Sequence, residues 1–346
     1  MIPVLGYAAA KPGAPLKPYS FERRSPGDRD IVIDILFCGI CHSDIHSARG
    51  EWGEGSFPLV PGHEIVGRVG ARGAKARRFK IGDRVGVGCF VDSCGQCAPC
   101  RSHLQQHCVK RPVFTYGAKD RFGRTTQGGY STRLVVDQNY VLRIPPGLPP
   151  EKAAPLLCAG ITTYSPLRRW KAGPGTSLGV VGLGGLGHMA VKIGRALGAR
   201  VTVISTSPEK EREARRLGAR GFLLSTDKRA LAKRAGSLDL IIDTVSADHP
   251  LEPLFELLKL SGTLVMVGAS PSDLAVPPFA LILGRKQLAG SLIGGLKETQ
   301  EMLDFCARRK VAPEIEIIAP RDINRAYERV VRGDVRYRFV IDNGKF

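Results

Sequence analysis

The sequence lacks the long apolar runs of a membrane protein. Its 346 residues contain no stretch of about 18 consecutive apolar residues, so we expect no transmembrane helix. The first residues also lack the basic segment followed by an apolar segment that marks a secretory signal peptide. We therefore expect a cytoplasmic protein, whose nine cysteines stay reduced and serve as metal ligands or core residues rather than disulfides.

Acidic residues are few relative to basic ones. The chain has 32 Asp and Glu against 51 Lys and Arg, a formal net charge of +19. A basic surface attracts nucleic acids, anionic membranes or phosphorylated cofactors. The basic residues are spread along the chain, with no dense tail and no patch interleaved with aromatic residues. We expect a solvated basic surface, with no membrane partner and no main function in nucleic-acid binding.

Internal repeats and low-complexity segments are also absent, and the length indicates two domains. Short β-branched runs at 31–37, 65–69 and 84–87, separated by glycine-rich turns, predict a compact β unit at the N-terminal end. The proline-rich run 144–150 predicts a domain boundary.

Four cysteines form the most specific metal motif, at positions 94, 97, 100 and 108. Four thiolates at this spacing close a tetrahedral shell without water, as in structural zinc sites. An iron–sulfur cluster is the alternative, because four cysteines bind that as well. The polar residues of this loop favour zinc, and we expect the intervening His103 and His107 to face solvent.

A second metal motif runs from Cys41 to His46 and continues at His63 and Glu64. A catalytic zinc has three protein ligands and one open position. Cys41 and His63 supply two of these ligands. Cys158, which follows the predicted domain boundary, is our candidate for the third, although a lone cysteine is more often a core residue.

The segment 177–205 predicts a dinucleotide-binding βαβ unit. A strand at 177–181 leads into the loop Gly182–Gly187, and a helix follows and ends at Gly198. The apolar residues of the helix fall on one face at a spacing of three and four: Leu186, Met189, Ala190, Ile193 and Leu197. In this context G-x-G-x-x-G lets the backbone approach a pyrophosphate at the helix N-terminus.

The residues after the second strand, 200–204, indicate which dinucleotide binds. NAD-binding sites usually place a carboxylate there to hold the ribose 2′-hydroxyl. This chain has Ser205, Thr206, Ser207 and Lys210, which suit a 2′-phosphate. We therefore predict NADP(H) rather than NAD, although Ser207 followed by proline is also a common start of a helix.

Strands and helices alternate over the rest of the chain, which predicts an α/β fold with a doubly wound parallel sheet. The expected strands are 222–224, 238–243, 263–267 and 337–341. The expected helices are 227–235, 251–260, 298–309 and 321–331. The last strand is placed to rejoin the N-terminal unit.

With these motifs the chain resembles the zinc-dependent medium-chain alcohol dehydrogenases, and within them the cinnamyl alcohol dehydrogenase branch with its bacterial broad-range aldehyde reductases. The resemblance extends from end to end. It rests on the segments 41–46, 62–64, 94–108, 158–162, 182–187, 205–210, 290–294 and 297–300.

The resemblance implies a GroES-like catalytic domain at 1–150 with a structural zinc lobe at 89–110. A Rossmann NADP-binding domain follows at 151–289, and 290–346 returns to complete the catalytic domain. It also implies a homodimer joined through the two dinucleotide-domain sheets near 281–293, with a tetramer as the alternative, since tetramers occur among relatives.

The resemblance further assigns roles to single residues. Cys41, His63 and Cys158 would hold a catalytic zinc, with Glu64 behind it as a transient ligand. Asp44 would orient the His63 ring, while Ser43 would accept the alcohol proton and His46 would pass it to solvent. The implied cofactor contacts are His42, Thr162, Gly182, Leu183, Gly184, Gly185, Leu186, Gly187, Ser205, Thr206, Ser207, Lys210 and Arg338. Plausible pocket walls are Trp52, Phe57 and Phe90, which are as readily explained as core aromatics.

The expected activity is zinc-dependent and NADP(H)-dependent interconversion of primary alcohols and aldehydes, with cinnamyl, benzyl or medium-chain aliphatic substrates. Two alternatives stay open at this point. One is a basic zinc-containing nucleic-acid-binding protein, and the other is a zinc-independent NADPH quinone reductase.

Overall fold

We describe the fold from a computed structural model, which covers residues 1–53 and 55–346. The chain forms two compact units. The first consists of Met1–Cys158 and Gly294–Phe346, and the second is Ala159–Ile293. Within the described ranges, no helix has both the length and the apolar character needed to cross a membrane.

The first unit is built on a seven-stranded sheet with the order β16-β17-β3-β4-β5-β9, and β8 also pairs with β3. Its strands are β3 (Asp30–Gly39), β4 (Ile65–Arg72), β5 (Arg84–Val87), β8 (Arg133–Asp137), β9 (Leu142–Arg143), β16 (Ile315–Ile318) and β17 (Arg338–Asp342). The C-terminal β17 pairs antiparallel with β3, with Val340 opposite Gly39. The return of the chain to the N-terminal unit, expected from the sequence, is therefore present.

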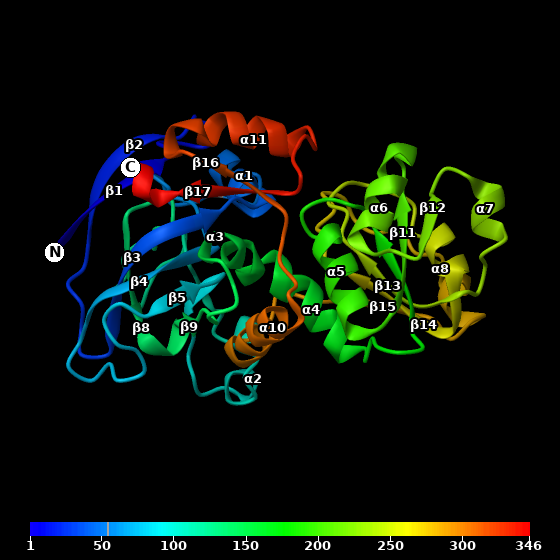
Figure 1. Cartoon of the computed structure of the whole chain (residues 1–346), viewed down its shortest axis with the longest axis horizontal. Helices are drawn as coiled ribbons and strands as arrows, with labels where there is room; N and C mark the ends of the chain where they lie inside the picture. The colour runs from blue at the N-terminus through cyan, green and yellow to red at the C-terminus, as the bar shows by residue number, and fades with distance from the viewer. Residues whose placement is uncertain (54) are drawn as a thin grey trace. The chain divides into compact units, whose positions relative to one another are not determined.

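Shorter elements surround this sheet. Two antiparallel pairs are β1 (Ile2–Ala8) with β2 (Lys17–Arg23), and β6 (Phe90–Asp92) with β7 (Val113–Phe114). The helices are α1 (His42–Arg49), α2 (Ala98–Arg101), α3 (Pro150–Ala153), α10 (Leu296–Arg309) and α11 (Ile323–Val331). Figure 1 shows both chain ends beside β1 and β2, where the rings of Tyr7 and Phe346 are 5.9 Å apart.

The second unit is a six-stranded, fully parallel sheet with the order β12-β11-β10-β13-β14-β15. Its strands are β10 (Ser177–Val181), β11 (Arg200–Ser205), β12 (Gly221–Leu224), β13 (Leu238–Asp243), β14 (Leu258–Met266) and β15 (Gln287–Gly290). Its helices are α4 (Ala159–Arg169), α5 (Gly187–Leu197), α6 (Glu211–Leu217), α7 (Lys228–Ala232), α8 (Glu252–Leu257) and α9 (Pro278–Ile282). Strands and helices alternate, and the helices lie along the sheet (Figure 1). This is the doubly wound parallel sheet that the sequence predicts.

Helix α5 follows the sequence pattern closely. Met189, Ala190 and Ile193 are fully buried, and Gly198 ends the helix in the left-handed conformation at φ 99°. Glycine adopts this conformation without the steric penalty that a Cβ atom would bring. The local sequence is therefore sufficient to place both ends of this helix.

Two predicted helices are too long. The predicted helix 251–260 ends at Leu257, because Leu258 pairs with Leu238 of β13 and begins β14. The apolar spacing fits a helix there, but backbone pairing with a neighbouring strand takes precedence. The predicted helix 227–235 ends at Ala232, and a turn leads from there to Gly236 at φ 61°.

Candidate functional site

The N-terminal end of α1 positions the first metal candidate. Cys41 precedes the helix in an extended conformation, with φ −116° and ψ 154°. The Asp44 carboxylate accepts a hydrogen bond of 2.9 Å from the Cys41 backbone N–H, which fixes this start of the helix. The Cys41 thiol is held there on a backbone with little freedom to move.

Four buried side chains converge in the first unit. The potential ligand atoms of Cys41, His63, Glu64 and Cys158 all lie within 4.8 Å of one another. The two thiols are 4.0 Å apart although 117 residues separate them in the chain. The structure thus brings together the Cys41–His63 pair and the third candidate, Cys158, together with Glu64.

Asp44 holds the His63 ring in place. One carboxylate oxygen of Asp44 lies 3.0 Å from His63 Nδ1, so the other ring nitrogen is the one available to a metal. The same carboxylate accepts hydrogen bonds from the Gly62 N–H at 3.1 Å and from the Tyr130 hydroxyl at 3.0 Å. Burial has the largest single effect and would lower the pKa of His63, but the charges of Asp44 and Cys89 and the hydrogen bonds with Asp44 and Cys41 together hold this pKa well above its usual value.

Glu64 forms a buried ion pair with Arg338, from the far end of the sequence. Burial raises the pKa of Glu64 to about 8, although Arg338 acts in the opposite direction. Within the described residues, Glu64 Oε2 is a buried oxygen without a hydrogen-bond partner. An unsatisfied carboxylate oxygen beside two thiols and an imidazole is what a metal ion would complete.

Sequence reasoning missed two side chains next to this cluster. The Cys89 thiol is a neighbour of Cys158. In the sequence, the only indication of this was that Cys89 follows shortly after the strand β5. The half-buried Tyr116 ring lies 5.7 Å from the His63 ring, centroid to centroid, and no sequence motif pointed to it.

The residues predicted for proton transfer lie on α1. The Ser43 hydroxyl is 3.6 Å from the Cys41 sulfur. The half-buried His46 ring stacks on the exposed Trp52 at 5.0 Å, and its Nδ1 contacts Glu51. The same helix begins with His42, which was predicted to bind the cofactor and is exposed.

The other two pocket candidates differ from each other in burial. Phe57 is half-buried. Phe90 is 4% exposed and packs edge-on against Tyr140, with ring centroids 6.2 Å apart.

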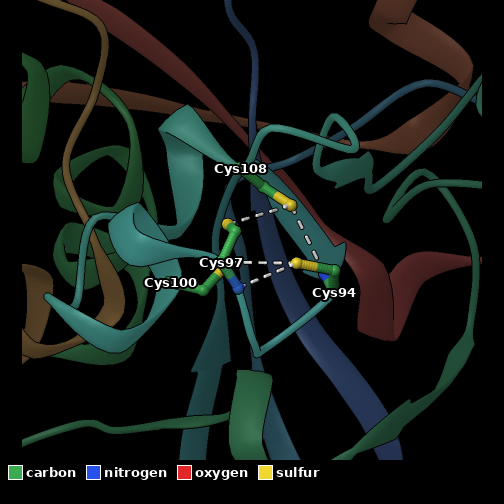
Figure 2. Close-up of side chains that lie close together, drawn as sticks. All are labelled: Cys94, Cys97, Cys100 and Cys108. Carbon is green, nitrogen blue, oxygen red and sulfur yellow. Dashed lines mark hydrogen bonds between the residues drawn. The ribbon is translucent and has the colours of Figure 1, made fainter.

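The second metal candidate is the cysteine lobe shown in Figure 2, in which the side chains of Cys94, Cys97, Cys100 and Cys108 point toward one another. The sulfurs of Cys94 and Cys100 are 3.9 Å apart, and those of Cys97 and Cys108 are 4.0 Å apart. Backbone N–H groups directed at Cys97 lower the pKa of its thiol to about 6, which favours the thiolate that a metal requires. His103 and His107 are exposed, as expected, and do not belong to this group.

The glycine loop lies in the second unit, between β10 and α5. Gly182 has a φ of 84°, and a Cβ atom at Gly187 would lie 2.1 Å from the Gly182 carbonyl oxygen. A Cβ atom at Gly184 would meet nothing within 4 Å, so the loop leaves open space there. Among the described residues, the buried Thr162 hydroxyl of α4 has no hydrogen-bond partner. The open loop and the unpaired hydroxyl fit a bound dinucleotide.

The predicted 2′-phosphate residues follow β11. Ser205 is buried and its hydroxyl accepts a hydrogen bond of 3.2 Å from the Ser207 N–H. Ser207 and Lys210 are half-buried, and Thr206 is exposed. The side chain of Ser207 makes no capping hydrogen bond to the turn that follows, so its hydroxyl is not used as a helix cap.

Comparison with known proteins gives matches over the whole chain. The protein-family model described as an alcohol dehydrogenase GroES-like domain matches residues 27–146. The family model described as a zinc-binding dehydrogenase matches residues 185–308. The chain is 55% identical over 343 residues to "NADP-dependent alcohol dehydrogenase C 1" of Mycolicibacterium smegmatis, which covers 99% of this chain and 98% of the relative.

Two solved structures have the same fold. A cinnamyl alcohol dehydrogenase from Sorghum bicolor is 49% identical, with a TM-score of 0.96 and coverage of 99% of this chain and 98% of that one. A cinnamyl alcohol dehydrogenase from Helicobacter pylori, complexed with NADP(H), is 45% identical, with a TM-score of 0.93 and coverage of 99% of both chains.

Proposed function

This chain belongs to the zinc-binding alcohol dehydrogenases, in their cinnamyl alcohol dehydrogenase branch, and we propose that it interconverts primary alcohols and aldehydes by hydride transfer with NADP(H). The observation that carries this proposal is the buried group of Cys41, His63, Glu64 and Cys158. We propose cinnamyl, benzyl or medium-chain aliphatic aldehydes as substrates. A nucleic-acid-binding protein would leave this group and the glycine loop unexplained, and a zinc-independent quinone reductase would leave the group unexplained, so neither alternative is favoured.

The donor atoms of the buried group fit a zinc ion. Cys41, His63 and Cys158 would hold it, and Glu64, with its unpaired oxygen, would serve as a transient ligand. A zinc ion bound there supplies a Lewis acid for the substrate oxygen. The four cysteines of the lobe would hold a second, structural zinc ion.

The residues around this group position the ligands and transfer the proton. Asp44 fixes the ring of His63 through its contact with Nδ1. Oxidation of an alcohol to an aldehyde releases a hydride and a proton, and we assign the proton to Ser43 and then to His46. The placement of Ser43 beside Cys41 and of His46 beside the exposed Trp52 supports this route from the site to solvent.

Most of the proposed cofactor residues belong to the second unit, and His42 and Arg338 belong to the first. The amide groups of the loop Gly182–Gly187 would bind the pyrophosphate, and Thr162 would supply its free hydroxyl. Ser205, Ser207 and Lys210 would bind the 2′-phosphate of NADP(H). We also propose that His42 contacts the cofactor. The guanidinium of Arg338 is engaged by Glu64, and its contact with the pyrophosphate stays a prediction.

We further propose a cytoplasmic homodimer. All nine cysteines are free, which agrees with a reducing compartment. Strand β15 lies at an edge of the parallel sheet, and the nearby side chains of Phe279, Ile282 and Leu283 are 67%, 63% and 82% exposed. An open strand edge next to exposed apolar side chains supports pairing of two copies through β15.

The first test is the initial velocity with benzaldehyde and with hexanal, with NADPH and NADH in parallel. We expect rapid NADPH oxidation and a preference of roughly 100-fold over NADH in kcat/KM, because charge-assisted hydrogen bonds to a phosphate contribute about 1.5–3 kcal/mol each. Removal of zinc should lower kcat/KM by at least about a thousandfold, since several kcal/mol of charge stabilisation is lost.

The controls separate the parts of this proposal. Added zinc should restore the activity of the stripped protein. A preference for NADH would contradict the assignment of Ser205, Ser207 and Lys210 and leave the chemistry intact. Absence of turnover with both cofactors, in protein shown to contain two zinc ions per chain, would contradict the alcohol dehydrogenase function itself.

A further inference from the structure

The loop 244–249, between β13 and α8, forms one wall of the glycine loop. The backbone N–H and the hydroxyl of Thr244 both donate to the Val181 carbonyl, at 3.1 and 2.7 Å. A Cβ atom at Gly182 would lie 3.0 Å from Val245, and one at Gly187 would lie 3.2 Å from the Thr244 hydroxyl. Because parallel strands end at one edge of a sheet, this loop lies where dinucleotides bind in such folds. A shift of the loop would therefore change the shape of the pyrophosphate site.

A single imidazole ties the start of this loop to its end. Asp243, the last residue of β13, is fully buried, and one of its carboxylate oxygens accepts a hydrogen bond of 3.0 Å from the Val245 N–H. The other oxygen lies 2.7 Å from His249 Nε2, while His249 Nδ1 lies 2.9 Å from the Ala247 carbonyl oxygen. The His249 side chain is only 19% exposed. The ring thus links β13, the middle of the loop and its last residues.

Both contacts of the ring require a proton. A backbone carbonyl only accepts hydrogen bonds, so His249 Nδ1 must donate to Ala247. The short contact between Nε2 and Asp243 needs one further proton, carried by either partner. The pair therefore holds one proton more than a neutral imidazole beside a carboxylate. Loss of this proton would leave one ring nitrogen without a hydrogen, so its lone pair would face either the Asp243 carboxylate or the Ala247 carbonyl oxygen, and one of the two contacts would be lost.

The charges around the ring favour retention of this proton. The titratable groups that face His249 are Asp243 on β13 and Asp248 within the loop, and Asp248 is held by the hydroxyls of Ser270 and Ser272. Burial lowers the pKa of His249, but the Ala247 carbonyl and the Asp243 charge together raise it above its ordinary value. Burial raises the pKa of Asp243 as well.

We propose that His249 is a positioning residue for dinucleotide binding, and that its protonated bridge to Asp243 and Ala247 holds the loop 244–249 in the shape that the pyrophosphate site requires. This inference rests on the proposed NADP(H)-dependent function. The bridge is complete below the ordinary pKa of histidine, about 6.5, and is lost as the pH rises through the raised pKa of the pair. NADPH binding therefore weakens on the alkaline side.

The test is the dissociation constant of NADPH, measured by the fluorescence of the bound nucleotide with the zinc-loaded full chain between about pH 6 and pH 10. In the wild type we expect this constant to rise roughly tenfold across the alkaline transition, as expected for one hydrogen bond of about 1.4 kcal/mol. His249→Phe removes the bridge, so it should bind NADPH roughly tenfold more weakly at neutral pH and lack this alkaline transition.

Asp243→Asn tests whether the pH dependence of NADPH binding comes from the extra proton of the bridge. The new amide can donate to His249 Nε2 and still accept from the Val245 N–H, so the bridge persists without an ionisable proton. This variant should keep the neutral-pH affinity of the wild type and lose the alkaline weakening. The matched control is Asp239→Asn, at the opposite end of the same strand, where the carboxylate pairs with Lys259 at 2.8 Å. It should behave like the wild type, and thermal melting checks that each variant is folded.

Two results would overturn the inference in distinguishable ways. If the wild type binds NADPH and all three variants show its affinity and its pH dependence, His249 has no positioning role and the proposed function stands. If the wild type binds neither NADPH nor NADH, the proposed function fails together with this inference.

Discussion

At the scale of residues, the Asp44 carboxylate organises the proposed catalytic zinc site. Its two oxygens receive hydrogen bonds from the Cys41 and Gly62 backbone N–H groups, from the His63 ring and from the Tyr130 hydroxyl. Tyr130 in turn lies 3.5 Å from the Tyr327 hydroxyl. These contacts fix the backbone of one proposed ligand and the ring of another, so the site is already shaped before a metal binds.

Lys210 offers a test of cofactor choice at a single position. Lys210→Glu should lower kcat/KM for NADPH roughly 100-fold and leave the value for NADH unchanged or raised, because a carboxylate repels the 2′-phosphate and can accept from a 2′-hydroxyl. Initial velocities with both cofactors measure this. Lys171→Glu is the control, since this exposed lysine precedes the amino end of β10, whereas Lys210 follows the carboxyl end of β11. An equal loss with both cofactors would indicate that Lys210 does not contact the 2′-phosphate.

At the scale of elements, the cysteine lobe contains very little regular structure. Helix α2 has four residues, and a single 3-10 turn of three residues follows at Gln105–His107. Elements this short are not stable by themselves, because the first helical turn fixes several residues in return for one hydrogen bond. The four thiolates and a metal ion are therefore expected to hold the lobe together.

Cys97→Ser tests this dependence on metal. We expect zinc content to fall from two ions per chain to one, and the melting temperature to fall by roughly 5–10 °C, at about 2–4 °C per kcal/mol. Elemental analysis and thermal unfolding measure the two effects. Cys306→Ala changes a buried cysteine of α10 outside both clusters and should keep both ions. Unchanged zinc content in Cys97→Ser would exclude the lobe as a metal site.

At the scale of the whole molecule, the exposed apolar side chains beside β15 are the basis for the proposed homodimer. The mass of a dimer should be twice 37.4 kDa in sedimentation or light scattering. Ile282→Glu places a charge next to the open strand edge and should yield monomers, since burial of an unpaired charge is costly. The same change at Ile81, which is 67% exposed in the first unit, is the control and should leave the dimer intact. If the wild type is a monomer, the proposal that β15 forms a dimer interface is wrong.

Sequence by itself determined the features that depend on short spacing. The four cysteines of the lobe, the glycine loop and helix α5 lie where the sequence analysis placed them, because each is specified within about 30 neighbouring residues. The doubly wound parallel sheet followed from the alternation of strands and helices. In these cases local hydrogen bonding and side-chain periodicity are sufficient to define the structure.

Only the tertiary structure decided the contacts between distant parts of the chain. The neighbours Cys89 and Tyr116, the ion pair of Glu64 with Arg338 across 274 residues, and the end of α8 at Leu257 were not readable from local patterns. His249 belongs to the same group, because nothing in its neighbourhood of the sequence shows that both ring nitrogens meet acceptors. The physical reason is that burial and pairing with a strand or charge from elsewhere in the chain outweigh local propensity, and the fold as a whole decides which partners meet.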